Sequence, residues 1–202
     1  PNQPIEVMLS LKQIKEICKL SEKIGALVIV DEAYYHFNNV TAKPLINVCK
    51  NLIVVRTFSK AFGMAGMRVG YTISNKKIIG YMLSIKPIYE INAFNMKLVR
   101  LLIKNINIMK NYVREVEKGR GLLKKFLKSK NIEMIGKYSN TVLFKLENKR
   151  KVDKVIKYLF SNKFIVRPMQ IDNDDRYIRA TLGSSKIMKK FVNKLNTALR
   201  LR

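Results

Sequence analysis

The amino-terminal half of the chain combines one amphipathic segment with two short apolar runs. Between Ser10 and Gly25, apolar residues recur at the three- and four-residue spacing of one helix face. Ser10 suits the N-cap of this helix and Gly25 suits its end. The runs 26–30 (ALVIV) and 51–57 (NLIVVRT) are unbroken and rich in branched aliphatic residues, which is typical of strands buried on both faces of a parallel sheet. A helix and two buried strands in this order predict an α/β fold.

The middle of the chain predicts a third strand followed by a long helical stretch. Residues 68–74 (RVGYTIS) have the composition of a strand. From Lys76 to about Lys130 the pattern is largely helical, and we expect a kink near Gly119 and Gly121, because glycine weakens a helix interior.

The last part of the chain predicts a small α+β module. Strands are expected at 140–146, 164–168 and 176–183, and helices at 152–162 and 184–201, the last capped by Ser184 or Ser185. We place the domain boundary inside the long helix. Residues 1–120 would then be part of a large domain whose amino-terminal half is missing, and residues 121–202 a small carboxy-terminal domain.

Charge is the most unusual feature of the composition. Of 202 residues, 40 are Lys or Arg and 14 are Asp or Glu, which gives a formal net charge of +26. Such an excess of positive charge favours binding to anionic polymers, such as nucleic acids, and to anionic membrane surfaces. The lysines, however, are spread along the chain, and no nucleic-acid-binding motif organises them. We therefore expect no specific nucleic-acid partner and no membrane partner, and a basic binding protein without enzymatic activity stays as an alternative.

Cysteine and histidine usage gives no sign of a metal site. Cys18 and Cys49, with the single histidine His36, form neither a disulfide framework nor a cluster with metal-ligand spacing. A reducing, cytoplasmic location follows as the expectation. The opening sequence PNQP has no methionine before it, and we expect the chain to be a piece of a longer protein.

Polar side chains follow both buried runs. Asp31 and Tyr34 follow the first, and Thr57, Ser59 and Lys60 end or follow the second. In parallel α/β sheets, ligands bind beyond the carboxyl ends of the strands, so these side chains should converge. A carboxylate, a phenol, two hydroxyls and an amine, with an arginine, are what pyridoxal phosphate (PLP) requires. The amine forms a Schiff base, the carboxylate pairs with the ring nitrogen, and the other groups hold the ring oxygen and the phosphate.

Two motifs carry a family resemblance. The segments 57–71 (TFSKAFGMAGMRVGY) and 30–37 (VDEAYYHF) strongly resemble the fold-type I PLP-dependent enzymes of the class I and II aminotransferases. The histidinol-phosphate aminotransferase branch looks closest, and the resemblance runs across the whole chain. It implies a PLP-binding large domain with a mainly parallel sheet, then a small α+β domain. It also implies a homodimer in the full-length form.

The resemblance implies a role for each matching residue. Lys60 looks like the catalytic lysine that forms the Schiff base and moves the proton at the substrate Cα. Asp31 looks like the partner of the ring nitrogen, and Tyr34 like the partner of the ring oxygen. The residues that look like phosphate ligands are Thr57, Ser59 and Arg68. Each also has a plain structural alternative: a solvated lysine, a turn aspartate, a core tyrosine or a surface arginine.

The opening segment departs from the family pattern. The family has Asn before the proline and Thr-Gly after it, whereas this chain has Asn2 and Gln3 before Pro4 and lacks Thr-Gly at 5–6. Either amide can meet the ring oxygen. The loss of Thr-Gly should alter a turn without removing a catalytic atom.

Three residues of the small module look like substrate ligands. Arg179, in the segment 176–183 (RYIRATLG), matches the arginine that receives the acidic group of the substrate. Arg167 matches a second arginine near the substrate phosphate, although a surface role is equally open. Asn140 matches an active-site asparagine. His36 is expected to pack rather than to catalyse.

The resemblance implies an aminotransferase acting between an amino acid or a histidinol-phosphate-like amino phosphate and a 2-oxo acid. A decarboxylase of a phosphorylated amino acid stays as an alternative. It would share Lys60, Asp31 and Arg68, and the segment 86–92 (KPIYEIN) departs from the pattern of histidinol-phosphate enzymes. Family members carry about as much chain again upstream, including a phosphate-binding helix start. We therefore expect this polypeptide alone to bind PLP poorly and to turn over negligibly.

Overall fold

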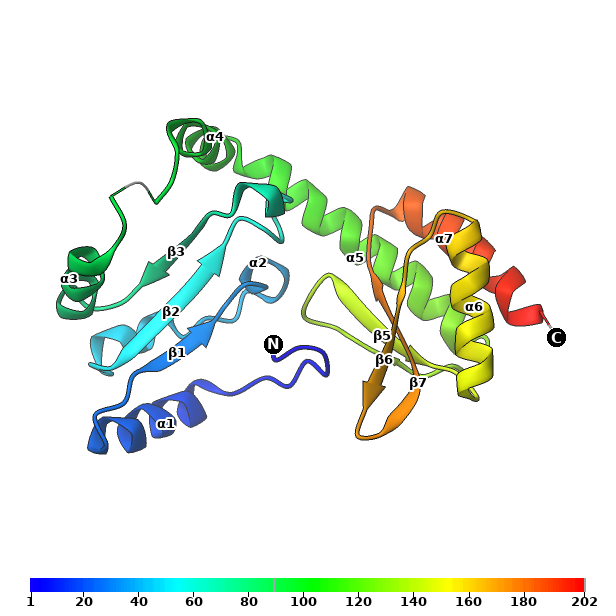
Figure 1. Cartoon of the computed structure of the whole chain (residues 1–202), viewed down its shortest axis with the longest axis horizontal. Helices are drawn as coiled ribbons and strands as arrows, with labels where there is room; N and C mark the ends of the chain where they lie inside the picture. The colour runs from blue at the N-terminus through cyan, green and yellow to red at the C-terminus, as the bar shows by residue number, and fades with distance from the viewer. Residues whose placement is uncertain (89, 202) are drawn as a thin grey trace. The chain divides into compact units, whose positions relative to one another are not determined.

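The computed structural model describes residues 1–88 and 90–201, and its contacts divide into two compact units (Figure 1). Unit 1 comprises Pro1 and Val7–Lys110, and unit 2 comprises Asn2–Glu6 and Asn111–Arg202. The division lies in the same long helix in which we placed the domain boundary, and it adds the opening segment to unit 2. The domains 1–120 and 121–202 stay a prediction for the longer protein.

Unit 1 begins with the helix that the sequence predicts. Ser10 caps α1 (Leu11–Lys23), and the side chain of Gln13 bonds back to the Ser10 backbone, so the two form a capping box. The further elements of unit 1 are β1 (Val28–Asp31), α2 (Tyr35–Asn38), η1 (Lys43–Asn47), β2 (Leu52–Thr57), η2 (Ala65–Met67), β3 (Gly70–Ile73), α3 (Lys76–Ile85), α4 (Ala93–Lys104) and the start of α5 (Ile106–Lys128).

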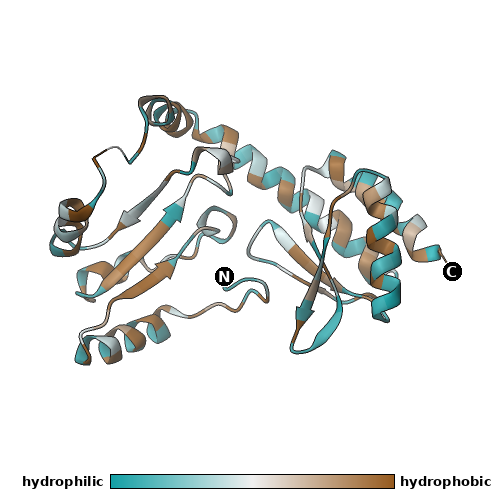
Figure 2. Ribbon diagram, viewed as in Figure 1, coloured by the Kyte–Doolittle hydropathy of each residue, from teal (hydrophilic) through white to brown (hydrophobic). Residues whose placement is uncertain are grey.

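The sheet of unit 1 has the order β1-β2-β3. The pair β1–β2 is parallel, with Asp31 opposite Val55, and the pair β2–β3 is antiparallel, with Thr57 opposite Gly70. Figure 2 shows β2 apolar along most of its length and hydrophilic at its carboxyl end. The core that covers one sheet face consists of Ile14, Cys18, Ala42, Cys49, Leu52 and Val54, with Val28 and Val30 packed against them.

The expectation that residues 26–30 are buried on both faces is wrong for this chain. Val28 and Val30 pack against the core, whereas Ile29 points to the opposite face and is 64% exposed. A short apolar run does not tell a strand covered on two faces from a strand covered on one, because it lacks the alternation that would separate them.

Among the described residues, the helical stretch is divided into three helices, at places other than the two glycines where we expect a kink. Residues 106–128 form a continuous helix through Gly119 and Gly121, and the stretch is instead interrupted between α3 and α4 and again at Asn105, between α4 and α5. The Asn105 side chain and backbone N–H both donate to the Leu101 carbonyl, at 2.9 and 3.0 Å, and end α4 there. Asparagine competes in this way with regular helix bonding.

Unit 2 is an antiparallel sheet covered by helices. Its sheet has the order β4-β5-β7-β6, and its core includes fully buried residues of α5, β5, α6, β7 and α7. The elements besides α5 are β4 (Met134–Ile135), β5 (Thr141–Lys145), α6 (Lys149–Ser161), β6 (Arg167–Ile171), β7 (Asp174–Thr181) and α7 (Ser185–Arg200). Ser184 is the N-cap of α7, as predicted. The two-residue strand β4 is too short for a sequence pattern to reveal. Among the described residues, no helix is long and apolar enough to cross a membrane.

The two glycines of α5 provide a matched test of the packing in unit 2. A Cβ at Gly119 would lie 2.5 Å from the Gly183 carbonyl oxygen and 2.8 Å from Met188 Cγ, whereas a Cβ at Gly121 would meet nothing within 4 Å. We expect Gly119→Ala to lower the free energy of unfolding by about 2 kcal/mol or more through overpacking. Gly121→Ala should raise it by about 0.5–1 kcal/mol, because alanine favours helix. Urea unfolding followed by circular dichroism measures both, and changes of equal sign would contradict the packing described.

Candidate active site

Lys60 lies on a short loop that leaves β2 and returns to β3. The strand pairing holds the two ends of this loop together, and Phe58 N donates to the Val69 carbonyl oxygen at 3.1 Å. Inside the loop, Met64 N donates to the Phe58 carbonyl oxygen at 3.0 Å. Phe58 and Val69 are buried together with Val99 of α4. The backbone that carries Lys60 is therefore tied to the sheet at both ends.

The two side-chain hydroxyls that are predicted to bind the phosphate lie together at the start of this loop. Thr57 Oγ1 donates to Ser59 Oγ at 2.9 Å and accepts from Ser59 N at 3.0 Å. Arg68 lies near the other end of the same loop, where it ends η2 with a φ of 54°. Its side chain is exposed, and its guanidinium donates to the Ala65 carbonyl oxygen at 3.2 Å.

Lys60 and Tyr34 come from different strand ends and meet. The Nζ atom of Lys60 lies 5.5 Å from the centroid of the Tyr34 ring, close enough for a cation–π attraction. Tyr34 is buried, and Lys60 is half-buried. Asp31 ends β1 and is exposed, and its Oδ1 accepts from Ala33 N at 2.8 Å. The Asp31 carboxylate therefore stabilises a turn, which is the structural alternative given above, and it lies at the carboxyl end of β1, as predicted.

A buried ion pair lies beside these residues. Arg56 Nε donates to Glu32 Oε2 at 2.9 Å, and both side chains are largely buried. The guanidinium of Arg56 also donates to Thr41 Oγ1 at 2.8 Å and lies 3.6 Å from the centroid of the Tyr35 ring. The other oxygen of Glu32 accepts from Ala42 N at 2.6 Å. The charges are therefore paired and hydrogen-bonded, which a buried ion pair needs.

The ion pair with Glu32 engages Arg56, so Arg56 is not available to bind a ligand. Burial lowers the pKa of Arg56, but hydrogen bonds with Tyr71 and Glu32 outweigh burial and raise that pKa, so the guanidinium stays charged and engaged. The sequence places an arginine at this end of β2 but does not reveal that Glu32 is its partner. The available signal was position: Glu32 follows Asp31 directly, and Arg56 directly precedes Thr57.

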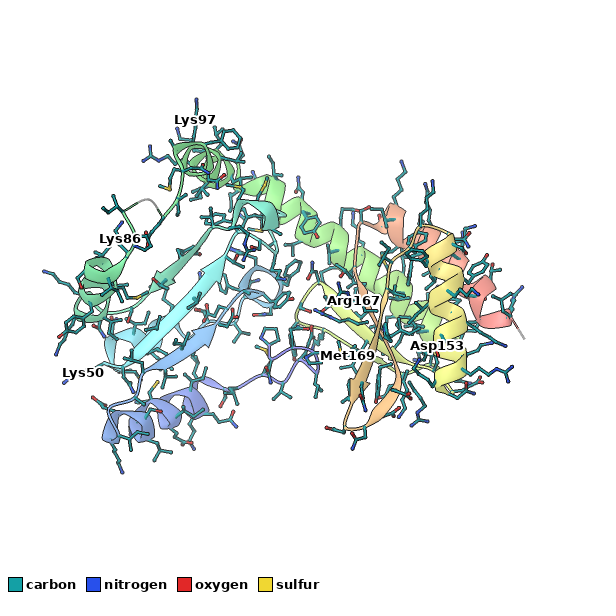
Figure 3. All side chains as sticks on the ribbon, in the orientation of Figure 1. Lys50, Lys86, Lys97, Asp153, Arg167 and Met169 are labelled. Atoms are coloured by element: carbon teal, nitrogen blue, oxygen red, sulfur yellow. The ribbon has the colours of Figure 1, made fainter. Side chains whose placement is uncertain are left out.

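The predicted substrate residues lie in unit 2. Arg179 of β7 is directly opposite Arg167 of β6, so both side chains leave the same face of the sheet; Figure 3 labels Arg167. Arg167 is exposed and Arg179 is half-buried. Asn140 is buried just before β5. The next residue, Thr141, donates through its hydroxyl to Gln3 Oε1 at 3.0 Å, so the opening segment with Asn2 belongs to this unit.

His36 packs between aromatic rings. Its ring centroid lies 5.1 Å from that of Phe62 in an edge-on arrangement and 5.0 Å from that of Tyr35. Burial, with a smaller contribution from the charge of Arg56, lowers the pKa of His36 from its ordinary 6.5. A half-buried ring with a lowered pKa is in keeping with a packing role.

The sequence profile of the aminotransferase class I and II family matches residues 1–195. This chain belongs to that family. It is 35% identical over 204 residues to a histidinol-phosphate aminotransferase of Caldanaerobacter subterraneus subsp. tengcongensis, an alignment that covers 98% of this chain and 55% of the relative. A histidinol-phosphate aminotransferase of Thermoanaerobacter pseudethanolicus is 32% identical, with the same coverage of both chains. The chain therefore spans about half the length of the curated relatives it matches.

Solved structures show the same fold. The histidinol-phosphate aminotransferase of Clostridium acetobutylicum matches with a TM-score of 0.82 at 25% identity, over 100% of this chain and 63% of that one. The enzyme of Sinorhizobium meliloti, solved with pyridoxal-5′-phosphate, has a TM-score of 0.86 at 18% identity, over 99% of this chain and 55% of that one. An L-threonine-O-3-phosphate decarboxylase of Porphyromonas gingivalis has a TM-score of 0.77 at 19% identity, over 100% and 63%. The aminotransferase fold is thus established for this chain, and it is shared by a decarboxylase.

The buried ion pair of this aminotransferase chain predicts unequal effects of single and double changes. Arg56→Met leaves the Glu32 carboxylate buried without its cation, and we expect the free energy of unfolding to fall by about 3 kcal/mol. The double variant Glu32→Leu with Arg56→Met removes both charges and should recover part of this loss. Lys149→Met, which breaks an exposed ion pair with Asp153, should change little. Urea denaturation of the variants measures this, and a harmless Arg56→Met would contradict the described network.

Because His36 is the single histidine of the chain, its titration can be followed without overlap from another imidazole. Because folding lowers the pKa of His36, protonation of the ring favours the unfolded chain, and stability should fall as the pH drops through 6.5. The imidazole signal in proton NMR should titrate with a midpoint below 6.5 in the folded chain and near 6.5 in concentrated urea. A folded-state midpoint at or above the urea value would argue against the buried ring.

Proposed function

We propose that this chain supplies the catalytic lysine and most of the cofactor contacts of a PLP-dependent aminotransferase. The observation that carries the proposal is the meeting of Lys60 and Tyr34 beside the paired hydroxyls of Thr57 and Ser59, in a chain of this family. An amine, a phenol and hydroxyls at one sheet edge, with Asp31 ending the neighbouring strand, fit the chemistry of the cofactor.

Each residue has a defined task in this proposal. Bound PLP supplies an electron sink for negative charge that develops at the substrate Cα. Lys60 provides the amine that holds the cofactor aldehyde, and as a general base it moves the Cα proton. Asp31 keeps a proton on the ring nitrogen, and Tyr34 donates to the ring oxygen. The phosphate would be held by Thr57, Ser59 and Arg68, where an arginine can bind two phosphate oxygens at once.

The residues of unit 2 are proposed to bind the substrate. Arg179 would pair with its acidic group, Arg167 with a phosphate, and Asn140 would contact substrate or cofactor. The ring-oxygen contact from the opening segment would come from Asn2 or Gln3. The relatives named above support a histidinol-phosphate-like amino donor and a 2-oxo acid acceptor, and we propose a cytoplasmic homodimer for the full-length form.

Decarboxylation of a phosphorylated amino acid is the competing reaction on this scaffold. The fold does not separate the two, because a solved decarboxylase shares it. The segment 86–92 that motivated this alternative includes Tyr89, which lies outside the described residues. Release of CO₂, rather than amino transfer to 2-oxoglutarate, would identify the decarboxylase.

Chemical trapping tests the role of Lys60 on this chain directly. We expect weak PLP binding, because the relatives are about twice as long, but borohydride reduction should fix the bound fraction. At stoichiometric PLP, peptide mapping should find the pyridoxyl label on Lys60 about tenfold above the exposed Lys76, since bound orientation raises the effective concentration. Lys60→Arg should abolish this preference and Lys76→Arg should not. Labelling of Lys60 at the level of other lysines would count against the proposal.

A further inference from the structure

Glu6 of the opening segment is buried against a loop far away in sequence. Only 7% of the residue is exposed. Its carboxylate accepts from Tyr138 N at 2.6 Å, from Lys137 N and from the hydroxyl of Ser139. The side-chain amide of Gln3 also donates to it, at 3.4 Å. One carboxylate thus receives four donors, three of them from residues 137–139.

The same loop is held from its other side by a cation. Arg120 of α5 donates to the Gly136 carbonyl oxygen at 2.7 Å and to the Ser139 carbonyl oxygen. Arg120 is itself paired with Glu117 at 3.0 Å. Two backbone carbonyls of this loop, those of Gly136 and Ser139, therefore accept from a guanidinium, and two of its backbone N–H groups donate to a carboxylate. Without Glu6, the N–H groups of Lys137 and Tyr138 would lose their partner.

The backbone of Glu6 has a conformation that is unfavourable for a residue other than glycine. Its φ is 60°, in the left-handed region that glycine adopts without cost and other residues do not. At this position the family pattern has the glycine of Thr-Gly. A glutamate at this position has a conformational cost that a glycine would avoid. We infer that the hydrogen bonds of the Glu6 side chain offset this cost and keep the backbone in the left-handed region.

The anchored segment carries an amide proposed to contact the cofactor. Glu6 N donates to the Asn2 carbonyl oxygen at 2.6 Å and closes the segment into a turn. Gln3 then accepts from the hydroxyl of Thr141, the neighbour of Asn140. We propose that Glu6 is a positioning residue, whose carboxylate fixes the segment 2–6 on the loop 137–141 and so sets the place of Gln3 against Thr141. The role of Gln3 rests on the proposed function, whereas the anchoring by Glu6 does not.

The charge state of Glu6 supports this anchor. Burial raises the pKa of Glu6, but hydrogen bonds from Ser139, Tyr138 and Lys137 outweigh burial and lower that pKa from the ordinary 4.5. A lowered carboxyl pKa means that the anchor is fully present above pH 4.5 and is lost as the pH falls through the lowered value.

Amide hydrogen exchange by NMR on the 202-residue chain tests the anchor. In Glu6→Gly, the amides of Lys137 and Tyr138 should exchange at least about tenfold faster, as expected for a local opening, and the Gln3 side-chain amide signals should shift. The amide of Ile178, in the centre of β7, should keep its protection. Glu6→Asp should restore part of the protection, and Glu147→Gln, a change at an exposed carboxylate of the same unit, should have no effect.

Two results of this experiment would overturn the proposal. Unchanged exchange at Lys137 and Tyr138 in Glu6→Gly would show that the carboxylate holds nothing. Equal acceleration at Ile178 would show a general loss of stability in place of local positioning. Loss of the anchor when the wild-type chain is taken below the lowered pKa, but not at pH 6, would support it.

A measurement of PLP binding by the same variants distinguishes failure of this proposal from failure of the proposed function. With PLP as the probe, Glu6→Gly should weaken binding about threefold or more, and it should have no further effect in a Gln3→Ala background, because coupled residues are not additive. Equal weakening in both backgrounds would overturn the link between Glu6 and Gln3. Absence of PLP binding in every variant would count against the proposed function, while exchange at Lys137 and Tyr138 would still decide the anchor.

Discussion

The parallel pairing of β1 and β2, closed by the ion pair of Glu32 and Arg56, is the constraint on which the candidate site depends. Each partner of the pair is the sequence neighbour of a proposed cofactor ligand, Asp31 on one strand and Thr57 on the other. Neighbouring residues in a strand point to opposite faces. A slip by one residue would bring Arg56 to the ligand face and turn Thr57 inward, leaving Glu32 buried without a cation. The ion pair therefore specifies register as much as it adds stability.

Much of unit 1 and unit 2 could be predicted from the sequence because the signals are local. Ser10 and Ser184 cap helices where the pattern places them, and β1 and β2, the strands that lead to Asp31 and Lys60, coincide closely with the two apolar runs. The membership in the aminotransferase family followed from two motifs that lie within forty residues of each other. Caps, periodicity and contiguous motifs act over a few residues, and sequence shows them directly.

The features that could not be predicted depend on partners distant in sequence. The exposure of Ile29 depends on what covers each face of the sheet, and apolar composition does not carry that information. Because glycine weakens helices, the sequence predicts a kink near Gly119, whereas the packing of Gly119 depends on Gly183 and Met188, more than sixty positions away. Glu6 bonds to Ser139 across 133 positions, so the altered opening motif by itself predicts only a changed turn.

On the proposed function, the choice between amino transfer and decarboxylation lies in unit 2. The residues of unit 1 that are proposed to hold the cofactor would serve both reactions, because both need the same electron sink. Bound PLP would stabilise the charge left by whichever bond to the substrate Cα breaks, and the anchoring of the acidic groups of the substrate would decide which bond that is. Arg167 and Arg179 leave one sheet face side by side, and two cations so placed can hold two acidic groups at once. An α-carboxylate paired with these arginines would be kept from leaving as CO₂, whereas a phosphate held there would leave the α-carboxylate unanchored.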